Sequence, residues 1–224
     1  DITQMGRFAV ERIAREVKSA LPGSVRTVTN SGVECLEFVP VLASSVYVNA
    51  PFSAESNTFN VVDFPQANDV SNLRVAIYTI NDNDVYIQPA NNSYIAAING
   101  SLSSVTDGER SVVLTANNRF PRESSVAQRI YFVDQPVSFC LSTASDQLMR
   151  HEAYGYNNPQ VTPSSGNSSL LAERLTPGAS GAFNYLTTVQ RPNGLVTLDF
   201  TFFAQGALDE TVHFIHDIAL VNVQ

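Results

Sequence analysis

The chain has 224 residues, of which 13 are basic and 21 are acidic, and its formal net charge is −8. The only lysine is Lys18, the other basic residues are Arg, and no polybasic tract occurs, which argues against a nucleic-acid partner. Charged residues make up 15% of the chain, against about 25% in an average soluble domain, and uncharged polar residues such as Asn take their place. This composition is typical of β-rich exported proteins, and no run approaches the roughly 18 apolar residues of a membrane span.

Residues 2–21 have the pattern of an amphipathic α-helix. Apolar side chains recur at steps of three and four residues, and we expect them to pack on a β-sheet: Met5, Phe8, Ile13, Val17 and Leu21. The opposite face pairs Arg7 with Glu11, Glu11 with Arg15, and Arg12 with Glu16, all four residues apart, which is the spacing of helical ion pairs. Pro22 and Gly23 end the helix.

From Arg26 onward the hydrophobic period changes to two, and short β-branched or aromatic segments alternate with Asn, Gly, Pro and Ser clusters. Strands are predicted at 24–29, 33–40, 45–48, 58–62, 73–80, 85–88, 94–98, 111–114, 129–134, 137–142, 147–152, 195–204 and 210–223, with surface loops at 154–169 and 177–181. We therefore expect an α+β fold, with the helix in residues 1–22 and a β-rich globular head in residues 23–224. The head is expected to be largely antiparallel, in two sheets, with the helix packed on it.

The two cysteines, Cys35 and Cys140, lie in strand-like segments that are far apart in the chain. A bridge between them would close a long loop and could stabilise the fold by on the order of 3 to 5 kcal/mol. The alternative is a pair of small buried thiols. The exported character of the composition favours the disulfide.

Two polar clusters are candidates for metal binding. His213, His216 and Asp217 lie in a segment with strand character, where the two histidines point to opposite faces and cannot bind one metal together. Asp82 and Asp84 offer oxygen ligands at alternating positions, as calcium loops do, but the Gly and the distal Glu of an EF-hand are missing. Ordinary strand residues and a solvated turn are therefore the favoured interpretations, and no cofactor is expected.

No set of catalytic residues converges in the sequence. The run Gly178-Ala179-Ser180-Gly181 comes near a nucleophile elbow, but Ala182 stands where the second Gly of that motif would fall. Glu34 and Glu37 are three residues apart in a predicted strand, so they point to opposite faces and cannot act as a glycosidase pair. We therefore expect a protein that is not an enzyme.

Several segments carry a resemblance to a known family: RFAVERIAREVKSALPGSVR at 7–26, CLEFVPV at 35–41, PVSFCL at 136–141 with QLMR at 147–150, and HFIHDIALVNVQ at 213–224. They resemble the helix that follows the membrane-embedded segment, and the strands, of type IV minor pilins and type II secretion pseudopilins. The resemblance is greatest to the minor pilins of mannose-sensitive haemagglutinin (MSHA) pili. Residues 43–118 resemble nothing specific.

The resemblance implies a structural subunit that acts in pilus assembly or initiation, and thereby in surface adhesion. Its partners would be other minor and major pilins and the inner-membrane assembly platform. A membrane-anchoring apolar segment would precede Asp1, so the protein would sit at the periplasmic face of the bacterial inner membrane before it enters a cell-surface pilus. Arg7, Glu11 and Arg15 would then be candidates for subunit contacts.

Two alternatives remain open. Within the family, a J-type pseudopilin at the tip of a type II secretion pseudopilus would have the same features. From another class, an exported carbohydrate-binding β-domain could use its tyrosines as a sugar platform: Tyr78, Tyr86, Tyr94, Tyr131, Tyr154 and Tyr156. The chain has no Trp, however, and aromatic residues in strands are more often packing residues.

Overall fold

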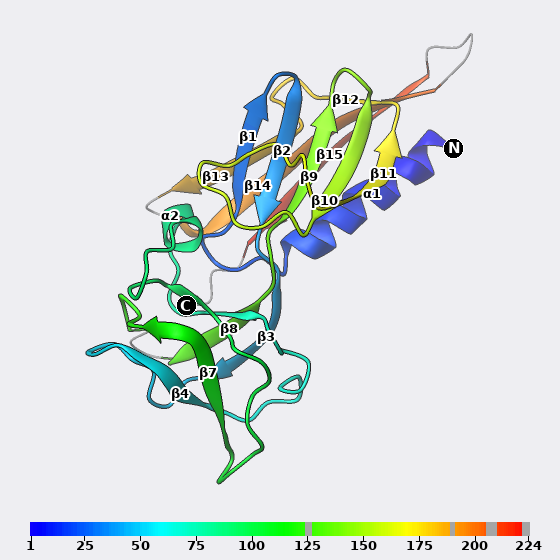
Figure 1. Ribbon diagram of the computed structural model, residues 1–224. Coiled ribbons are helices and arrows are strands. Elements are labelled where there is room, and N and C mark those ends of the chain that lie inside the picture. Colours follow the sequence, from blue (N-terminus) through cyan, green and yellow to red (C-terminus); the bar gives the residue numbers. More distant parts are fainter. Residues whose placement is uncertain (124–126, 189–190, 205–209, 221–224) are drawn as a thin grey trace. The chain divides into compact units, whose positions relative to one another are not determined.

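The computed structural model describes residues 1–123, 127–188, 191–204 and 210–220 (Figure 1). Their contacts divide the chain into two compact units. Unit 1 contains residues 1–20, 25–40 and 135–222, and unit 2 contains residues 21–24, 41–134 and 223–224. The boundary expected after residue 22 does not separate a helix from a head, because the helix belongs to unit 1 together with many of the strands.

The predicted α+β class is wrong, because the protein is mostly β-sheet. Strands hold 47% of the residues and helices 10%, and the strands of the described residues form four antiparallel sheets where two were expected. The helices are α1 (Ile2–Val17) and the short α2 (Asp82–Tyr86). The helical pattern is the strongest local signal in the sequence, but it covers only a small part of the chain. None of the described helices has the length and apolar character needed to cross a membrane.

Helix α1 is amphipathic, as predicted, and buries one face in unit 1. The Asp1 side chain caps its start by accepting a hydrogen bond from the Thr3 amide at 2.9 Å. Its buried residues are Ile2, Gly6, Ala9, Val10, Ile13, Ala14 and Val17. Gly6 is required by the packing, since a Cβ there would lie 2.3 Å from the Phe214 ring.

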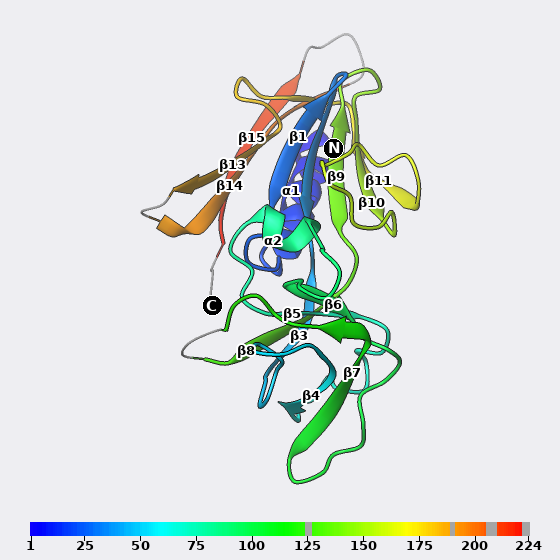
Figure 2. The ribbon, with the colours of Figure 1, turned by 60° about the vertical axis from the view of Figure 1, so that its left-hand side comes forward.

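Unit 1 is built from two sheets and α1. One sheet has the order β1-β2-β9-β10-β11, with β1 Arg26–Asn30, β2 Val33–Phe38, β9 Val137–Ser142, β10 Gln147–Glu152 and β11 Asn167–Glu173. In the other, β14 (Arg191–Phe203) pairs on one side with β12 (Leu175–Pro177) and β13 (Phe183–Thr188), and on the other side with β15 (Thr211–Ala219). The helix contacts β11, β14 and β15, and so closes one open side between the sheets (Figures 1 and 2).

The core of unit 1 lies between these three layers. Phe139 from the first sheet, Phe200 and Phe202 from the second, and Ile13 and Val17 from α1 are all fully buried in one apolar cluster. Burial of a side chain of this size contributes roughly 1.5 to 3 kcal/mol. The helix is therefore part of the core and not an appendage of it.

Unit 2 has its own sheets and its own core. One sheet has the order β3-β8-β5-β6, with β3 Val41–Val46, β8 Arg129–Val133, β5 Arg74–Ala76 and β6 Ile95–Ala97. The other pairs β4 (Ser56–Val62) with β7 (Glu109–Asn118). Tyr47, Phe59, Phe120 and Phe132 are buried in its core, and the Phe59 and Phe120 rings pack edge to face with centroids 5.9 Å apart.

Candidate functional site

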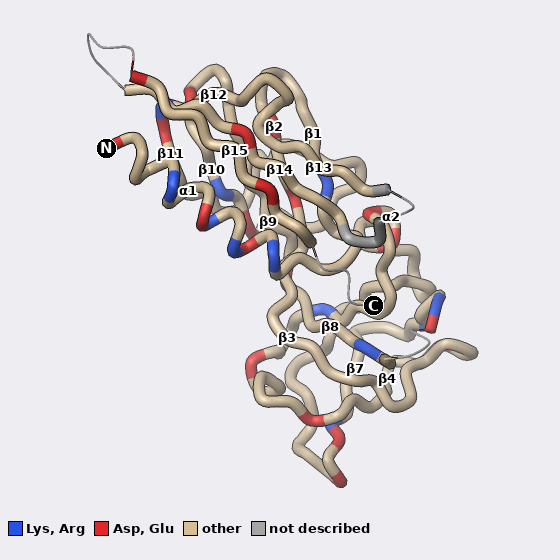
Figure 3. The backbone as a smooth tube through the Cα atoms, turned by 180° about the vertical axis from the view of Figure 1, so that it is seen from behind, with Lys and Arg blue, Asp and Glu red and all other residues tan. Residues whose placement is uncertain are grey.

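The exposed face of α1 is the surface that best fits a binding role. We call it the α1 stripe, and it consists of Arg7, Phe8, Glu11, Arg15 and Lys18, all exposed. Its three cations and one anion give it a net charge of 3 − 1 = +2 on a chain of net charge −8. Figure 3 shows the basic residues along α1.

Phe8 was predicted to pack on the sheet, and that prediction is wrong, because 58% of its side chain is exposed. The packed face instead uses Ala9 and Val10, next to it in sequence. Ile13 and Val17 are buried in the core as predicted, and Met5 is partly buried against it. Leu21 is also buried, but it lies beyond the end of α1 and outside that apolar cluster.

The ion pairs expected on the stripe are absent from the described structure. Arg7, Glu11 and Arg15 form no ion pair with a described residue, so their charges are available to a partner. The third predicted pair, Arg12 with Glu16, is confirmed, and Glu16 also pairs at 3.0 Å with Arg150 on β10. These contacts lie beside the stripe and attach α1 to the first sheet.

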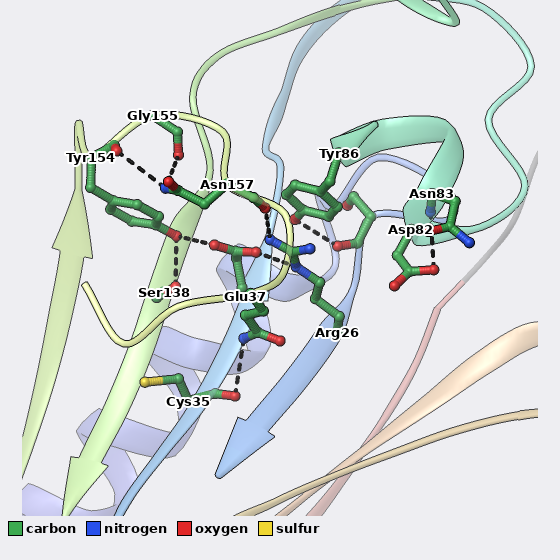
Figure 4. A network of polar contacts seen from close by, with 12 residues as sticks. Arg26, Cys35, Glu37, Asp82, Asn83, Tyr86, Ser138, Tyr154, Gly155 and Asn157 are labelled. Carbon is green, nitrogen blue, oxygen red and sulfur yellow. Dashed lines mark hydrogen bonds and ion pairs between the residues drawn. The ribbon is translucent and has the colours of Figure 1, made fainter. Parts of the chain in front are cut away.

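A buried polar network lies on the outer face of the first sheet (Figure 4). Glu37 on β2 is fully buried and pairs with Arg26 on β1, whose Nη2 donates to the Asn157 carbonyl at 2.6 Å. The Tyr154 hydroxyl donates to Glu37 Oε1 at 2.8 Å, and it is 2.6 Å from Ser138 Oγ. Burial and the nearby Glu37 charge raise the pKa of Tyr154, which keeps its proton on the hydroxyl.

This network attaches a loop to the sheet, and it engages both oxygens of the Glu37 carboxylate. Both Glu37 oxygens already accept hydrogen bonds, and the groups around them are Arg and Tyr donors. The network joins β1, β2 and β9 to the segment that follows β10. A buried ion pair of this kind keeps the loop and the strands in one arrangement. Removal of either partner would leave the charge of the other buried without compensation.

The disulfide prediction is confirmed, since Cys35 and Cys140 are bonded. They lie directly opposite each other on β2 and β9, with Cα atoms 4.1 Å apart. This spacing is close to that of a non-hydrogen-bonded antiparallel pair, so the bridge fits the regular sheet. A structural disulfide is consistent with an oxidising, exported compartment.

His213 and His216 lie on β15, as predicted. His213 Nε2 is 2.5 Å from Asp199 Oδ1, and the Asp217 carboxylate accepts from the Thr197 hydroxyl at 2.6 Å. His216 occupies the alternate face of the strand. Among the residues that the structure describes, no three His, Cys, Asp or Glu side chains come together as a metal site would require.

The two calcium candidates, Asp82 and Asp84, lie in the first turn of α2, where a solvated turn had been expected. The Asn81 side chain accepts from the Asp84 amide at 3.1 Å, and Asp84 Oδ2 accepts from the Ile80 amide at 2.9 Å. Asp82 Oδ1 accepts from the Asn83 amide at 3.0 Å. Each side chain therefore satisfies a nearby backbone donor, which is the ordinary role of Asn and Asp at a helix start.

The Gly178–Gly181 run forms a turn. The Gly181 amide donates to the Gly178 carbonyl at 3.1 Å, and Glu34 Oε2 accepts from the Ala182 amide at 2.7 Å. Gly178 is packed against the Asp199 carboxylate so closely that a Cβ would overlap it. Ser180 is exposed, and Glu34 and Glu37 contact different partners, so neither predicted motif assembles catalytic groups.

One pocket of about 450 Å³ lies in unit 1, and no sequence pattern predicted it. Its lining comes from the β9–β10 turn, the end of β11 and the end of β14: Ser145, Asp146, Gln147, Glu173, Arg174, Phe203 and Ala204. Arg174 is 3.8 Å from the Glu173 carboxylate. No local motif could have predicted a pocket whose residues come from three distant segments.

The six tyrosines of the sugar-platform alternative belong to two different units, and two of them are engaged in hydrogen bonds within the chain. Four of the six lie in unit 2 and two in unit 1. Tyr86 is buried with its hydroxyl donating to the Ser24 carbonyl at 2.9 Å, and Tyr154 is committed to Glu37.

Comparisons with protein-family models, with curated proteins and with solved structures found no match.

Proposed function

We propose that the protein is a structural subunit of an exported filament, a minor pilin of an MSHA-type type IV pilus that acts in pilus assembly and initiation and is not an enzyme. The observation that carries the proposal is the α1 stripe. One face of α1 is fixed in the core of unit 1, and the other presents an exposed Phe8 among charges that have no described partner.

Such a surface is suited to binding another subunit. A large aromatic side chain on an exposed helix face keeps apolar surface in contact with water, and burial of that surface by a partner is favourable. Aromatic and Arg residues are enriched at protein interfaces. The flanking charges of Arg7 and Arg15 would steer an acidic partner and fix its orientation. The remainder of the chain is acidic, with a net charge of −10 outside the first 26 residues. Subunits of similar composition would therefore offer a complementary charge.

The disulfide and the sequence resemblance extend this proposal to a location and a set of partners. The bridge between Cys35 and Cys140 suits the periplasm. The protein would lie at the periplasmic face of the inner membrane and then in a surface pilus. Its partners would be other minor and major pilins and the assembly platform, with an apolar segment ahead of Asp1 as its anchor.

The test is complementation of a strain that lacks the gene, scored for surface pili with the protein level measured in parallel. Phe8→Glu and the double reversal Arg7→Glu with Arg15→Glu should abolish or strongly reduce piliation while the protein level is kept. The matched control is Leu186→Glu, because Leu186 is 55% exposed on β13, whereas the helix contacts β11, β14 and β15. Normal piliation from both stripe variants would reject the stripe as a contact, and normal piliation in the deletion strain would reject the assembly role.

A J-type pseudopilin is the alternative within the family. Complementation separates the two machines, because a pseudopilin would restore secretion of a type II substrate and leave surface pili unchanged.

A carbohydrate-binding module is a second candidate, favoured by the pocket near β11 and β14. Its lining combines the Phe203 ring with the Gln147 amide and the Arg174 guanidinium, groups that can contact sugar hydroxyls and ring faces. A glycan array with the purified protein tests it, and binding that is lost in Phe203→Ala would favour this function over the pilin.

A further inference from the structure

Strand β15 forms one edge of its sheet and lacks the sequence features that usually prevent an edge from pairing with other strands. Its nine residues pair with β14 in an unbroken register from Thr211 to Ala219. The strand contains no Pro, Lys or Arg, and no bulge interrupts its pairing. Exposed edge strands in monomeric proteins normally carry such features to prevent pairing with a second chain. Figure 3 shows β15 beside β14 from behind.

The backbone groups that this edge offers can be assigned from the hydrogen bonds at its two ends. The Ala204 amide donates to the Glu210 carbonyl at 2.9 Å, and the Leu220 amide donates to the Gly194 carbonyl at 2.9 Å. Hydrogen-bonded pairs alternate along an antiparallel ladder, so the even-numbered residues of β15 bond to β14. The odd-numbered residues direct their N–H and C=O groups outward: Thr211, His213, Ile215, Asp217 and Ala219. Within the described part of the chain, no strand other than β14 pairs with β15.

We propose that a second copy of this chain binds here, adding its own β15 antiparallel to the first about a twofold axis at Ile215. The two four-stranded sheets would then become one continuous sheet across the dimer. The inference is independent of the pilin proposal, because it uses no residue of the α1 stripe.

The side chains of β15 are complementary to themselves in this register. Ile215, which is 64% exposed, lies opposite the partner's Ile215 and loses its contact with water. His213, whose Nε2 contacts Asp199, lies opposite the partner's Asp217, and the symmetry produces this polar pair twice. Apolar pairs and hydrogen-bonding polar pairs are among the cross-strand combinations that stabilise antiparallel sheets.

Other registers lose these pairs. A slip by two residues places Ile215 opposite either the partner's His213 or the partner's Asp217, and it removes both His–Asp pairs. A slip by one residue would place the outward N–H and C=O groups of one strand opposite even-numbered partner residues, whose N–H and C=O groups are already bonded to the partner's β14. The sequence of the strand therefore selects a single antiparallel register, and this symmetry favours a second copy over an unrelated extended segment as the occupant.

The first test is the mass in solution, measured by analytical ultracentrifugation of the 224-residue chain at increasing concentration. The wild type should form dimers, and Ile215→Lys should be monomeric, because it places two like charges against each other at the axis. Leu186→Lys is the matched control, since Leu186 is 55% exposed on the same sheet, and it should still dimerise. Ile215→Pro should also be monomeric, because it removes the N–H that would donate to the partner strand. The monomer should still fold, because that N–H points outward and an edge strand tolerates its loss.

The second test fixes the register with a short bismaleimide cross-linker. Cys35 and Cys140 are bonded to each other, so Ile215→Cys supplies one reactive thiol per chain. Ile215→Cys should give a covalent dimer, and Leu186→Cys should not. A wild type that stays monomeric at about 1 mM, a concentration at which even a millimolar Kd would be visible, overturns the proposal. So does a dimer that survives Ile215→Lys or cross-links equally well at Leu186→Cys.

Discussion

At the residue scale, the most consequential group is Glu37, a carboxylate with no exposed surface that is paired with Arg26. Replacement by Ala leaves the Arg26 charge buried without its carboxylate, and we expect a loss of about 3 to 5 kcal/mol in the free energy of unfolding. Tyr154→Phe removes one hydrogen bond and should cost about 1 kcal/mol. Urea denaturation of each variant measures both values. Equal costs for the two variants would show that the ion pair is not the main element of this network.

His151 supplies a prediction for pH at the same scale. Partial burial lowers its pKa in the folded protein below the ordinary value of 6.5. The unfolded chain therefore binds the proton more readily, so the stability that neutral His151 contributes is present above pH 6.5 and is lost as the pH falls below it. We expect the free energy of unfolding to fall between pH 7 and pH 5.5, and His151→Gln should reduce that slope. An NMR titration that shows the folded His151 ring with a raised pKa would contradict this prediction.

At the element scale, the two faces of α1 should respond differently to truncation. Ile13→Ala removes a fully buried side chain from the core of unit 1 and should cost about 2 to 5 kcal/mol. Phe8→Ala removes a side chain that is 58% exposed and should change stability by no more than about 0.5 kcal/mol. Thermal and chemical denaturation of the isolated chain measure both. A large loss from Phe8→Ala would show that the ring packs within its own chain.

The elements also show how far the sequence could predict the fold. The α1 helix and strands such as β9 and β10 follow from periodicity, because their apolar residues face a core. Phe8 was assigned to the buried face of α1 because it is next in sequence to Ala9, and Ala9 is the residue that occupies that face. The edge strand β11 was missed, since it begins with an exposed polar Asn-Ser-Ser run that has no apolar alternation. The prediction of a strand at 85–88 was wrong, because Asn81 caps a helix that includes Val85 and Tyr86.

The candidate site was predictable only in part. Arg7, Glu11 and Arg15 were identified from helical spacing, and the structure leaves them exposed. The Arg26–Glu37–Tyr154 network and the free edge of β15 depend on contacts between segments that are distant in the chain, and no local pattern contains them. The contact between Cys35 and Cys140 is the exception, because two cysteines in an exported protein can be predicted to form a disulfide however far apart they lie in the sequence.

At the scale of the whole molecule, the chain order makes most of unit 2 an insertion into unit 1. The chain leaves unit 1 after Pro40 and returns to it at Gln135. The strands before and after this inserted segment, β2 and β9, are neighbours in one sheet. Phe38 pairs with Val137, so the two ends of the insertion leave adjacent strands of one sheet. The disulfide joins the same two strands three residues further on.

This topology predicts that unit 1 folds without residues 41–134. Because β2 and β9 are antiparallel neighbours, a short turn such as Asn-Gly can connect them as a hairpin in place of the insertion. The core of unit 1 draws its buried residues from α1 and its own two sheets, and all of them remain in the shortened chain. Insertions of this kind are tolerated where the ends of the host chain lie close together. We expect the shortened protein to unfold cooperatively in urea and to keep its Cys35–Cys140 bridge in non-reducing peptide mapping. It should lose part of its stability, because the hydrogen bonds that Thr79 and Tyr86 donate to the Pro22 and Ser24 carbonyls are removed. A shortened chain with dispersed amide NMR signals would establish unit 1 as an independent folding unit. A chain that lacks them, while the full protein under the same conditions shows them, would mean that unit 1 needs the inserted residues to reach its fold.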